Sequence, residues 1–339
     1  MQIALDAMAG DHGHEELIAG ALLAVEQAGL GVSLVGDEKL LQKHLEILAP
    51  NKKAAGLVKI VHSSQVIEMN EHPVDAVRKK KDASVMVAFD LVRRGEADAA
   101  VSAGNSGATM AAAMRKLGRL SSISRPGIAS IFPTLKKPVV LMDIGANVDC
   151  RPQHLLQFAI MASAFSRVID IANPRVGLLT IGEETGKGNS LIKETYPLLE
   201  QSSLNFIGNV EGRDVFQGNV DVIVCDGFVG NICLKVSEGL AEAAMLMLRD
   251  EILKSFSAKI GYFLARHAFK AFRKRVDYAE YGGAPLLGVD GVGIICHGKS
   301  SAQAIKNAIL EAAKMVKRNI NQDIVESLAA SKHVVELEN

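Results

Sequence analysis

One lysine of the sequence lies in a glycine-rich loop that is suited to binding phosphate. Lys187 stands in the stretch GEETGKGNS at 182–190, directly after an apolar run. A nucleotide-binding loop needs G-x-x-x-x-G-K followed by Ser or Thr, whose hydroxyl ligates Mg²⁺. Here the spacing from Gly182 to Gly186 is one residue short, and Gly188 carries no hydroxyl. The loop therefore predicts a site for a phosphate that is not part of a nucleotide, with Lys187 as the candidate catalytic cation. A solvated loop charge is the alternative.

A second glycine-rich stretch, VSAGNSGATM at 101–110, places polar side chains ahead of an expected helix. Glycine permits close backbone approach, and the free N–H groups at a helix start attract anions. An ordinary strand-to-helix turn with capping residues has the same composition, so both interpretations stay open. The candidate substrate-binding residues here are Ser102, Gly104, Asn105 and Ser106.

Further loops place an asparagine beside a glycine at the end of an expected strand. They are GANVD at 145–149, GNVEGRD at 208–214 and GFVGN at 227–231. Asn and Gly are common turn residues, but an amide also donates to phosphate or to a developing oxyanion without adding charge. We take Asn231 as a candidate catalytic donor and Asn147, Asp226 and Gly227 as candidate substrate-binding residues.

Other kinds of catalytic site find little support in the sequence. Acidic and imidazole groups stand at expected strand ends, but no H-x-x-x-H or D-x-D spacing appears, so we predict no metal. No Ser or Cys stands in a G-x-S-x-G elbow, and the glycines at 288–298 lack the dinucleotide spacing, so we predict no cofactor. The four cysteines form no C-x-x-C pair, which indicates reduced thiols.

The stretch 252–276 combines Lys and Arg with aromatic and aliphatic side chains and contains no Asp or Glu. We expect Gly261 to divide it into a helical hairpin. Such a composition suits an anionic membrane surface, and a dimer interface or a core helix with basic flanks is the alternative. The candidate membrane-contact residues are Phe256, Ile260 and Leu264 on the apolar face, with Lys259, Arg266, Lys270 and Arg273 facing the headgroups.

The elements that must position these loops are short apolar strands, each followed by a loop and an amphipathic helix. The strands are expected at 2–6, 32–35, 97–101, 138–142, 175–181, 204–207 and 220–225. This alternation predicts an α/β fold with a mostly parallel sheet flanked by helices. In such folds the loops at the carboxyl ends of the strands gather at one edge, where ligands bind.

We expect a single unit over 1–339, built as two lobes with a cleft between them. Lobe one covers about 1–120 and 283–339, and lobe two about 121–282, with a protruding helical hairpin at about 238–276. The final helix, at about 301–317, is expected to pack back on lobe one. The irregular stretches RLSSISRPG and YGGAP mark the two places where the chain passes from one lobe to the other.

The composition limits the partners and the location. Hydrophobic residues make up 48% of the chain, and 38 basic residues balance 38 acidic ones. Zero net charge excludes overall basicity as a route to nucleic acid, so we predict no nucleic-acid partner. No run is apolar enough to span a bilayer, and the first residues lack the layout of a signal peptide, so we expect a cytoplasmic protein.

Taken in order, the motifs DAMAGDHG, VSAGNSGATM, DIGANVD, GEETGKGN, DGFVGNICLK and YGGAPLLGVDG resemble the phosphate acyltransferase family of bacterial phospholipid synthesis from end to end. The resemblance implies an α/β/α sandwich like that of phosphotransacetylases and isopropylmalate dehydrogenases, and a homodimer. It implies reversible transfer of a long-chain fatty acyl group from acyl carrier protein to inorganic phosphate. The acyl phosphate would pass to a membrane-bound glycerol-3-phosphate acyltransferase, which places the enzyme peripherally on the inner face of the cell membrane.

The implied mechanism is a direct attack of phosphate on the thioester, without a covalent acyl-enzyme. The leaving thiol has a solution pKa of about 8.5, so its departure needs little acid assistance. Two other classes remain as alternatives. A metal-dependent dehydrogenase shares the architecture but needs a dinucleotide motif and an aspartate cluster. A non-catalytic scaffold recruited to membranes would leave the polar loops without a purpose.

Overall fold

The fold is built on one long mixed sheet. The computed structural model describes residues 1–48, 56–276 and 282–331, and of residues 273–276 the backbone only. Within these ranges eleven strands pair in the order β3-β2-β1-β4-β11-β10-β5-β6-β9-β7-β8. Neighbours pair in parallel except where β10 or β5 takes part. The predicted mostly parallel α/β sheet is confirmed.

The strands fall into two groups of opposite direction. The first group is β1 (Gln2–Asp6), β2 (Gly31–Gly36), β3 (Val58–His62), β4 (Ala99–Ser102) and β11 (Gly293–Ile295). The second group is β6 (Val139–Met142), β7 (Val176–Leu179), β8 (Phe206–Val210) and β9 (Val222–Val224). Between the groups lie β10 (Ala284–Leu287) and β5 (Gly127–Phe132).

Three consecutive antiparallel pairings at β10 and β5 reverse the direction of the sheet. The loops after β1 and β4 therefore lie at one edge of the sheet. The loops after β6, β7 and β9 lie at the opposite edge. The expectation that all strand-end loops gather at a single edge is wrong, because it assumed one direction for every strand.

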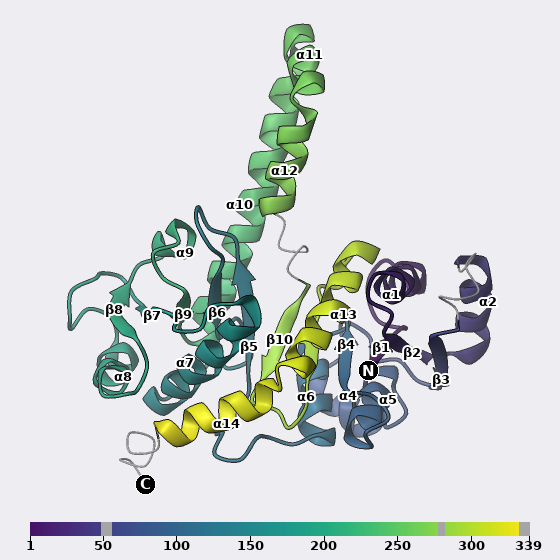
Figure 1. The fold of residues 1–339 in the computed structure, drawn as a ribbon, viewed down its shortest axis with the longest axis horizontal. Helices are drawn as coiled ribbons and strands as arrows, with labels where there is room; N and C mark the ends of the chain where they lie inside the picture. The colour runs from purple at the N-terminus through teal and green to yellow at the C-terminus, as the bar shows by residue number, and fades with distance from the viewer. Residues whose placement is uncertain (49–55, 277–281, 332–339) are drawn as a thin grey trace.

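Helices cover both faces of the sheet, because successive strand residues point to opposite sides. Ile3 and Leu5 enter one core, while Ala4 enters the other. The first core is covered by α1 (His14–Ala28), α2 (Glu38–Leu48), α7 (Pro152–Ser166), the short η1 (Arg167–Ile169), α8 (Ser190–Glu200), α13 (Ala302–Lys317) and α14 (Ile320–Ala330). The second is covered by α4 (Pro73–Lys79), α5 (Ser84–Arg93), α6 (Ser106–Lys116), α9 (Asp214–Gln217) and the start of α10 (Gly227–Lys254). As predicted, the helix capped by Ser301 packs back on α1 (Figure 1).

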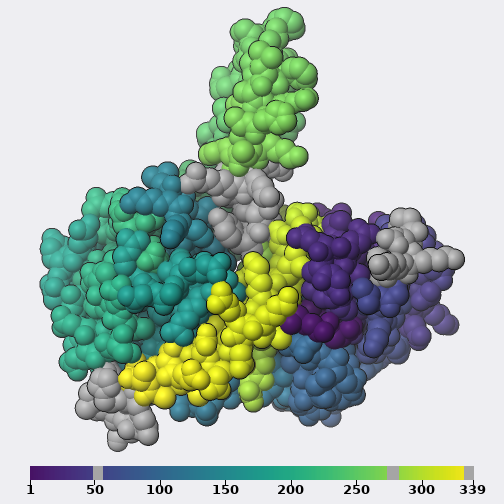
Figure 2. All heavy atoms as spheres, in the orientation of Figure 1, coloured from purple at the N-terminus to yellow at the C-terminus, as the bar shows by residue number. Residues whose placement is uncertain are grey.

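A helical hairpin projects from this body. It consists of α10, α11 (Phe256–Leu264) and α12 (Arg266–Val276), and beyond the start of α10 it stands clear of the other elements (Figures 1 and 2). The predicted hairpin is confirmed, but its first helix begins at Gly227 rather than near 238. Gly261 lies inside α11 and does not break it; the helices are divided at Ser255, whose hydroxyl caps α11, and at Ala265. Among the described residues no helix is both long and apolar enough to cross a membrane.

The predicted division into two lobes coincides with the reversal in the sheet. The crossings near 120 and 283 fall on either side of the pair β10 and β5, which are hydrogen-bonded to each other. The sheet is continuous through this point, and the division into lobes stays a prediction.

Candidate active site

A buried carboxylate organises the loop after β6. Asp143 is fully buried, and its two oxygens accept hydrogen bonds from the backbone N–H groups of Ile128, Gly145, Ala146 and Asn147 at 2.7–3.3 Å. Burial raises the pKa of this carboxyl, and the hydrogen bonds from Ala146 and Asn147 oppose that rise. The sequence showed Asp143 only as an acid at a strand end. A short turn of the form D-x-G-A-N was the available signal for its structural role.

Asn147 joins this loop to the next one. Its side-chain Nδ2 donates to Pro126 O at 2.8 Å and to Asp143 Oδ2 at 3.0 Å. Its carbonyl oxygen accepts from the N–H of Gly227 at 2.7 Å and from the thiol of Cys150 at 3.4 Å. Since both amide hydrogens are engaged inside the protein, the structure gives Asn147 a positioning role. Its predicted contact with substrate stays a prediction.

The start of α10 is pressed against this loop. Asp226 caps the helix by accepting from the N–H of Val229 at 2.9 Å. A Cβ on Gly227 would lie 2.8 Å from Asp143 Oδ2, and one on Gly230 would lie 1.9 Å from Asp143 O. Only glycine fits such close contacts between a helix and a loop. The predicted binding residues Asp226 and Gly227 thus fix the helix in place here.

Replacing Gly230 with alanine is expected to destabilise the protein. The new methyl group would overlap a buried backbone oxygen, and such overpacking costs about 1–3 kcal/mol. Gly239 lies in the same helix with nothing within 4 Å of its Cβ position, so Gly239→Ala is the matched control. That control should gain up to roughly 1 kcal/mol from helix propensity. Urea unfolding of both variants checks this, and equal midpoints would contradict the contact.

Asn231 follows one residue after this contact and differs from its neighbours. Its side chain is exposed, and its amide makes no hydrogen bond with any residue in the described ranges. It lies beside Gly145, whose φ is 141° and whose Cβ position is 3.6 Å from Asn231 Cγ. A free amide near the start of a helix, beside a glycine, is available to donate to a ligand.

Lys187 lies on the same edge of the sheet, because β7 neighbours β9 in parallel. Its backbone N–H donates to Glu184 O at 3.1 Å, and its side chain passes over Gly182. The ammonium group is exposed and makes no ion pair with any residue that the structure describes. No hydrogen bond among these residues joins Lys187 to Asn231. The two candidate catalytic residues therefore share an edge, and both are free to contact a ligand.

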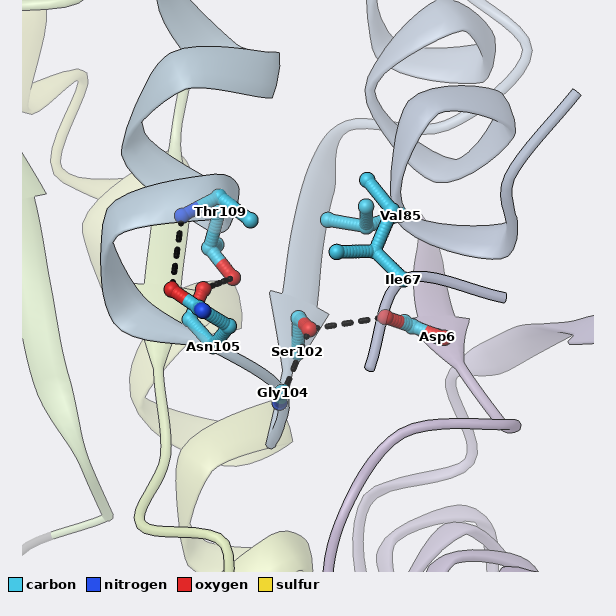
Figure 3. Close-up of a pocket in the computed structure, with 8 residues that line it drawn as sticks. Asp6, Ile67, Val85, Ser102, Gly104, Asn105 and Thr109 are labelled. Atoms are coloured by element: carbon cyan, nitrogen blue, oxygen red, sulfur yellow. Dashed lines mark hydrogen bonds between the residues drawn. The ribbon is translucent and has the colours of Figure 1, made fainter. Parts of the chain in front are cut away.

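The loop after β4 lies on the opposite edge and is bonded internally. Ser102 donates to the buried Asp6 at 2.8 Å and accepts from the N–H of Gly104 at 3.2 Å (Figure 3). Asn105 caps α6 by accepting from the N–H of Ala108, while Ser106 is the exposed first residue of that helix. The pocket between these residues measures about 10 Å³, room for roughly one water. Their predicted substrate contact stays a prediction, and the structure does not bring them to Lys187 and Asn231.

The thiols near Asp143 are poor nucleophiles. Burial, together with the charge of Asp143, raises the pKa of Cys150 to about 11. Burial also raises the pKa of Cys225, whose thiol contacts Asp143 O at 3.6 Å, and that of Cys233. A thiol attacks as the thiolate, so little of the reactive form is present at neutral pH.

Solved structures define the fold class. The chain is similar to a phosphotransacetylase from Streptococcus pyogenes, with a TM-score of 0.61 and 18% identity over 94% of each chain. At this identity the likeness concerns the fold alone. The predicted fold is thus confirmed as the α/β architecture of the phosphotransacetylases.

Sequence relatives define the family more narrowly. Residues 1–323 match the family described as "Fatty acid synthesis protein". The chain is 53% identical over 340 residues to a phosphate acyltransferase of Pelobacter propionicus, covering 100% of this chain and 97% of that protein. It is 54% identical over 329 residues to one of Geotalea uraniireducens, covering 97% and 94%. The chain belongs to the phosphate acyltransferase family, and it is therefore an acyltransferase of fatty acid and phospholipid synthesis, as the motifs predicted.

Proposed function

We propose that this chain transfers a long-chain fatty acyl group reversibly from acyl carrier protein to inorganic phosphate, giving acyl phosphate for phosphatidic acid synthesis. One observation carries the proposal: Lys187 and Asn231 present a free cation and a free amide on the same edge of the sheet. A phosphate dianion and a developing oxyanion need such donors. The family's link to fatty acid synthesis supports a carrier-protein thioester as the acyl donor.

The reaction consists of one displacement at the thioester carbonyl. A phosphate oxygen forms a bond to the carbonyl carbon, the tetrahedral intermediate carries its charge on the former carbonyl oxygen, and the C–S bond then breaks. The departing thiolate has a solution pKa of about 8.5 and leaves without much acid assistance. Lys187 neutralises the phosphate or the oxyanion, and Asn231 donates to the same charge. The raised pKa values of the neighbouring thiols favour this direct route over a covalent acyl-enzyme.

A direct assay tests the function. Acyl carrier protein loaded with a long-chain acyl group is incubated with phosphate and enzyme, and free thiol and acyl phosphate are followed together. Both products should appear in equal amounts and only when phosphate is present. Loss of thioester without phosphate, or no turnover at all, would overturn the proposal.

We also propose that the chain acts as a homodimer. The base of α10 carries apolar side chains at four-residue steps, and all of them are exposed: Phe228, Ile232, Val236 and Leu240. An apolar stripe of this length on an exposed helix is characteristic of a protein interface. A second copy of the chain is the partner that the family resemblance implies.

The tip of the hairpin supports a peripheral position on the inner face of the cell membrane. Phe256 is 80% exposed and Leu264 75%, and Ile260 is exposed between them. Lys259, Arg266 and Lys270 are exposed on the same two helices, and Arg273 lies on α12 with its side chain outside the described residues. Apolar residues with basic neighbours suit an anionic bilayer surface. There the product meets the membrane-bound glycerol-3-phosphate acyltransferase that we propose as its consumer.

Leu264→Glu should abolish the salt-resistant part of membrane binding while activity in solution persists. Each basic residue near an anionic surface contributes about 1 kcal/mol, and salt screens this term but not the apolar insertion. Co-sedimentation with anionic and neutral vesicles at rising salt measures both parts. Leu240→Glu, on the α10 stripe, is the control and should weaken the dimer but not vesicle binding. Equal binding to both lipids, or no effect of Leu264→Glu, would assign α11 and α12 to the dimer interface.

A further inference from the structure

A pocket of about 300 Å³ opens beside Lys187, between its loop, the end of β8 and one face of α8. The helix contributes Lys193, Tyr196, Pro197 and Glu200, whose spacing of three and four residues places them in one row. A single water needs only about 10–15 Å³ of such space, and small-molecule pockets begin near 300 Å³. The pocket is therefore much larger than inorganic phosphate requires.

The lining of this pocket combines two cations with apolar surface and acceptors. Lys187 and Lys193 are exposed and suit an anion, while Tyr196 and Pro197 supply apolar surface. Glu200, at the far end of the row, repels a free anion and accepts from N–H or O–H donors. The pocket thus fits an anionic group that is attached to a chain bearing hydrogen-bond donors.

A buried amide gives the same indication independently. Asn209, at the end of β8, lines the pocket and is only 7% exposed. Its Nδ2 donates to Glu184 O at 3.0 Å, but its Oδ1 accepts no hydrogen bond from any residue in the described ranges. A buried acceptor without a partner is unfavourable, so the site calls for a donor on the ligand.

We propose that this pocket seats the phosphopantetheine arm of the acyl carrier protein. The inference rests on the proposed function, which makes a carrier-protein thioester the acyl donor. The arm is a phosphate ester whose chain bears a hydroxyl, two amides and a dimethyl-substituted carbon. Its phosphate pairs with Lys193, a hydroxyl or amide hydrogen bonds to Asn209 Oδ1, and the dimethyl carbon packs on Tyr196 and Pro197.

Two small thioesters separate the phosphate contact from the rest. Acyl-phosphopantetheine and acyl-pantetheine differ only in the phosphate. In Lys193→Gln, kcat/KM should fall roughly tenfold for the first thioester, the scale of one lost charge-assisted hydrogen bond. For acyl-pantetheine it should stay nearly unchanged, as should the KM for inorganic phosphate. Lys39→Gln, an exposed lysine on α2, is the matched control and should alter neither thioester.

The Asn209 contact predicts a different pattern, because both thioesters carry its donor. Asn209→Leu should raise KM for both equally, with little change in kcat. Because Asn209 also holds Glu184 O, the variant's melting temperature is measured alongside. Asn209→Asp keeps an acceptor at Oδ1 and should restore part of the affinity if the contact is to a donor.

Direct binding keeps this inference separate from the proposed function. Phosphopantetheine without an acyl group is titrated into the enzyme by calorimetry, and Lys193→Gln should bind it about tenfold more weakly than the parent. A chain that binds the arm in this way but makes no acyl phosphate would overturn the proposed function and leave the pocket assignment intact. An equal loss for both thioesters in Lys193→Gln, or a rise only in the KM for inorganic phosphate, would overturn the pocket assignment.

Discussion

Replacing Lys187 with alanine should reduce kcat/KM by about a hundredfold or more while the protein remains folded. Removing one electrostatic donor from a developing oxyanion costs roughly 10²–10³ in rate in enzymes with an oxyanion hole. The substitution should leave the fold unchanged, because the ammonium of Lys187 is exposed and forms no ion pair with the described residues. The loop is held instead by backbone contacts and by the Asn189 cap of α8.

Steady-state kinetics at saturating carrier protein, with a thermal melt of each variant, measure this effect. Lys187→Arg keeps the charge with a different shape and should retain more activity than Lys187→Ala. Lys317→Ala, an exposed lysine on α13, is the control. Near-normal kcat/KM in a folded Lys187→Ala protein would remove this residue from the chemistry.

Asn231→Asp should reduce activity more than Asn231→Ala does. The aspartate keeps the shape of asparagine but replaces two N–H donors with an anion beside an anionic substrate. Alanine only removes the donors, at a cost on the order of 10²-fold. The aspartate variant should thus be the less active of the two.

Rate measurements at several phosphate concentrations test the sign of this difference. Repulsion between the introduced carboxylate and phosphate should appear as a raised KM for phosphate, while loss of an oxyanion donor lowers kcat. If Asn231→Asp proves as active as Asn231→Ala, the amide is not a donor to an anion.

Seven strands were predictable from the sequence, namely β1, β2, β4, β6, β7, β8 and β9, whereas β3 and β11 were not predicted. The strand at 2–6 is predicted to the residue, and the others lie within a few residues of their positions. In each, a short apolar run ends at turn residues, which is a local signal. The free amide of Asn231 and the free cation of Lys187 were also predictable, because both depend on their own loops.

The reversal of strand direction within the sheet was not predictable in this way. No helix follows β5 or β10 directly, so they carry no strand-loop-helix signal. They pair with each other across more than 150 residues of chain, as the register of Ile128 and Leu286 shows. The loops at 102–106 and 143–147 look alike in sequence but leave opposite edges because of these two strands. Likewise, the bond from Ile128 N–H to Asp143 depends on pairing between β5 and β6.

In the hairpin, the helices are divided at other residues than the predicted Gly261. Glycine is a poor helix former, which made Gly261 the expected turn. One glycine costs only about 1 kcal/mol in a helix, and α11 absorbs it. Ser255 followed by Phe256 is the better signal, because a serine that caps a helix stops one helix and starts the next.

The close packing of the start of α10 against the Asp143 loop has a mechanical consequence. The helix of 28 residues is about 42 Å long and is clamped at one end, where Gly227 and Gly230 press against the Asp143 loop. Asn231 lies one residue beyond the clamp, whereas the far end of the helix at Lys254 lies 24 residues beyond it. If the helix pivots there as a rigid rod, a sideways swing of that end moves Asn231 by only roughly a twentieth as much. Tilting of the hairpin would therefore leave Asn231 almost in place beside the Asp143 loop.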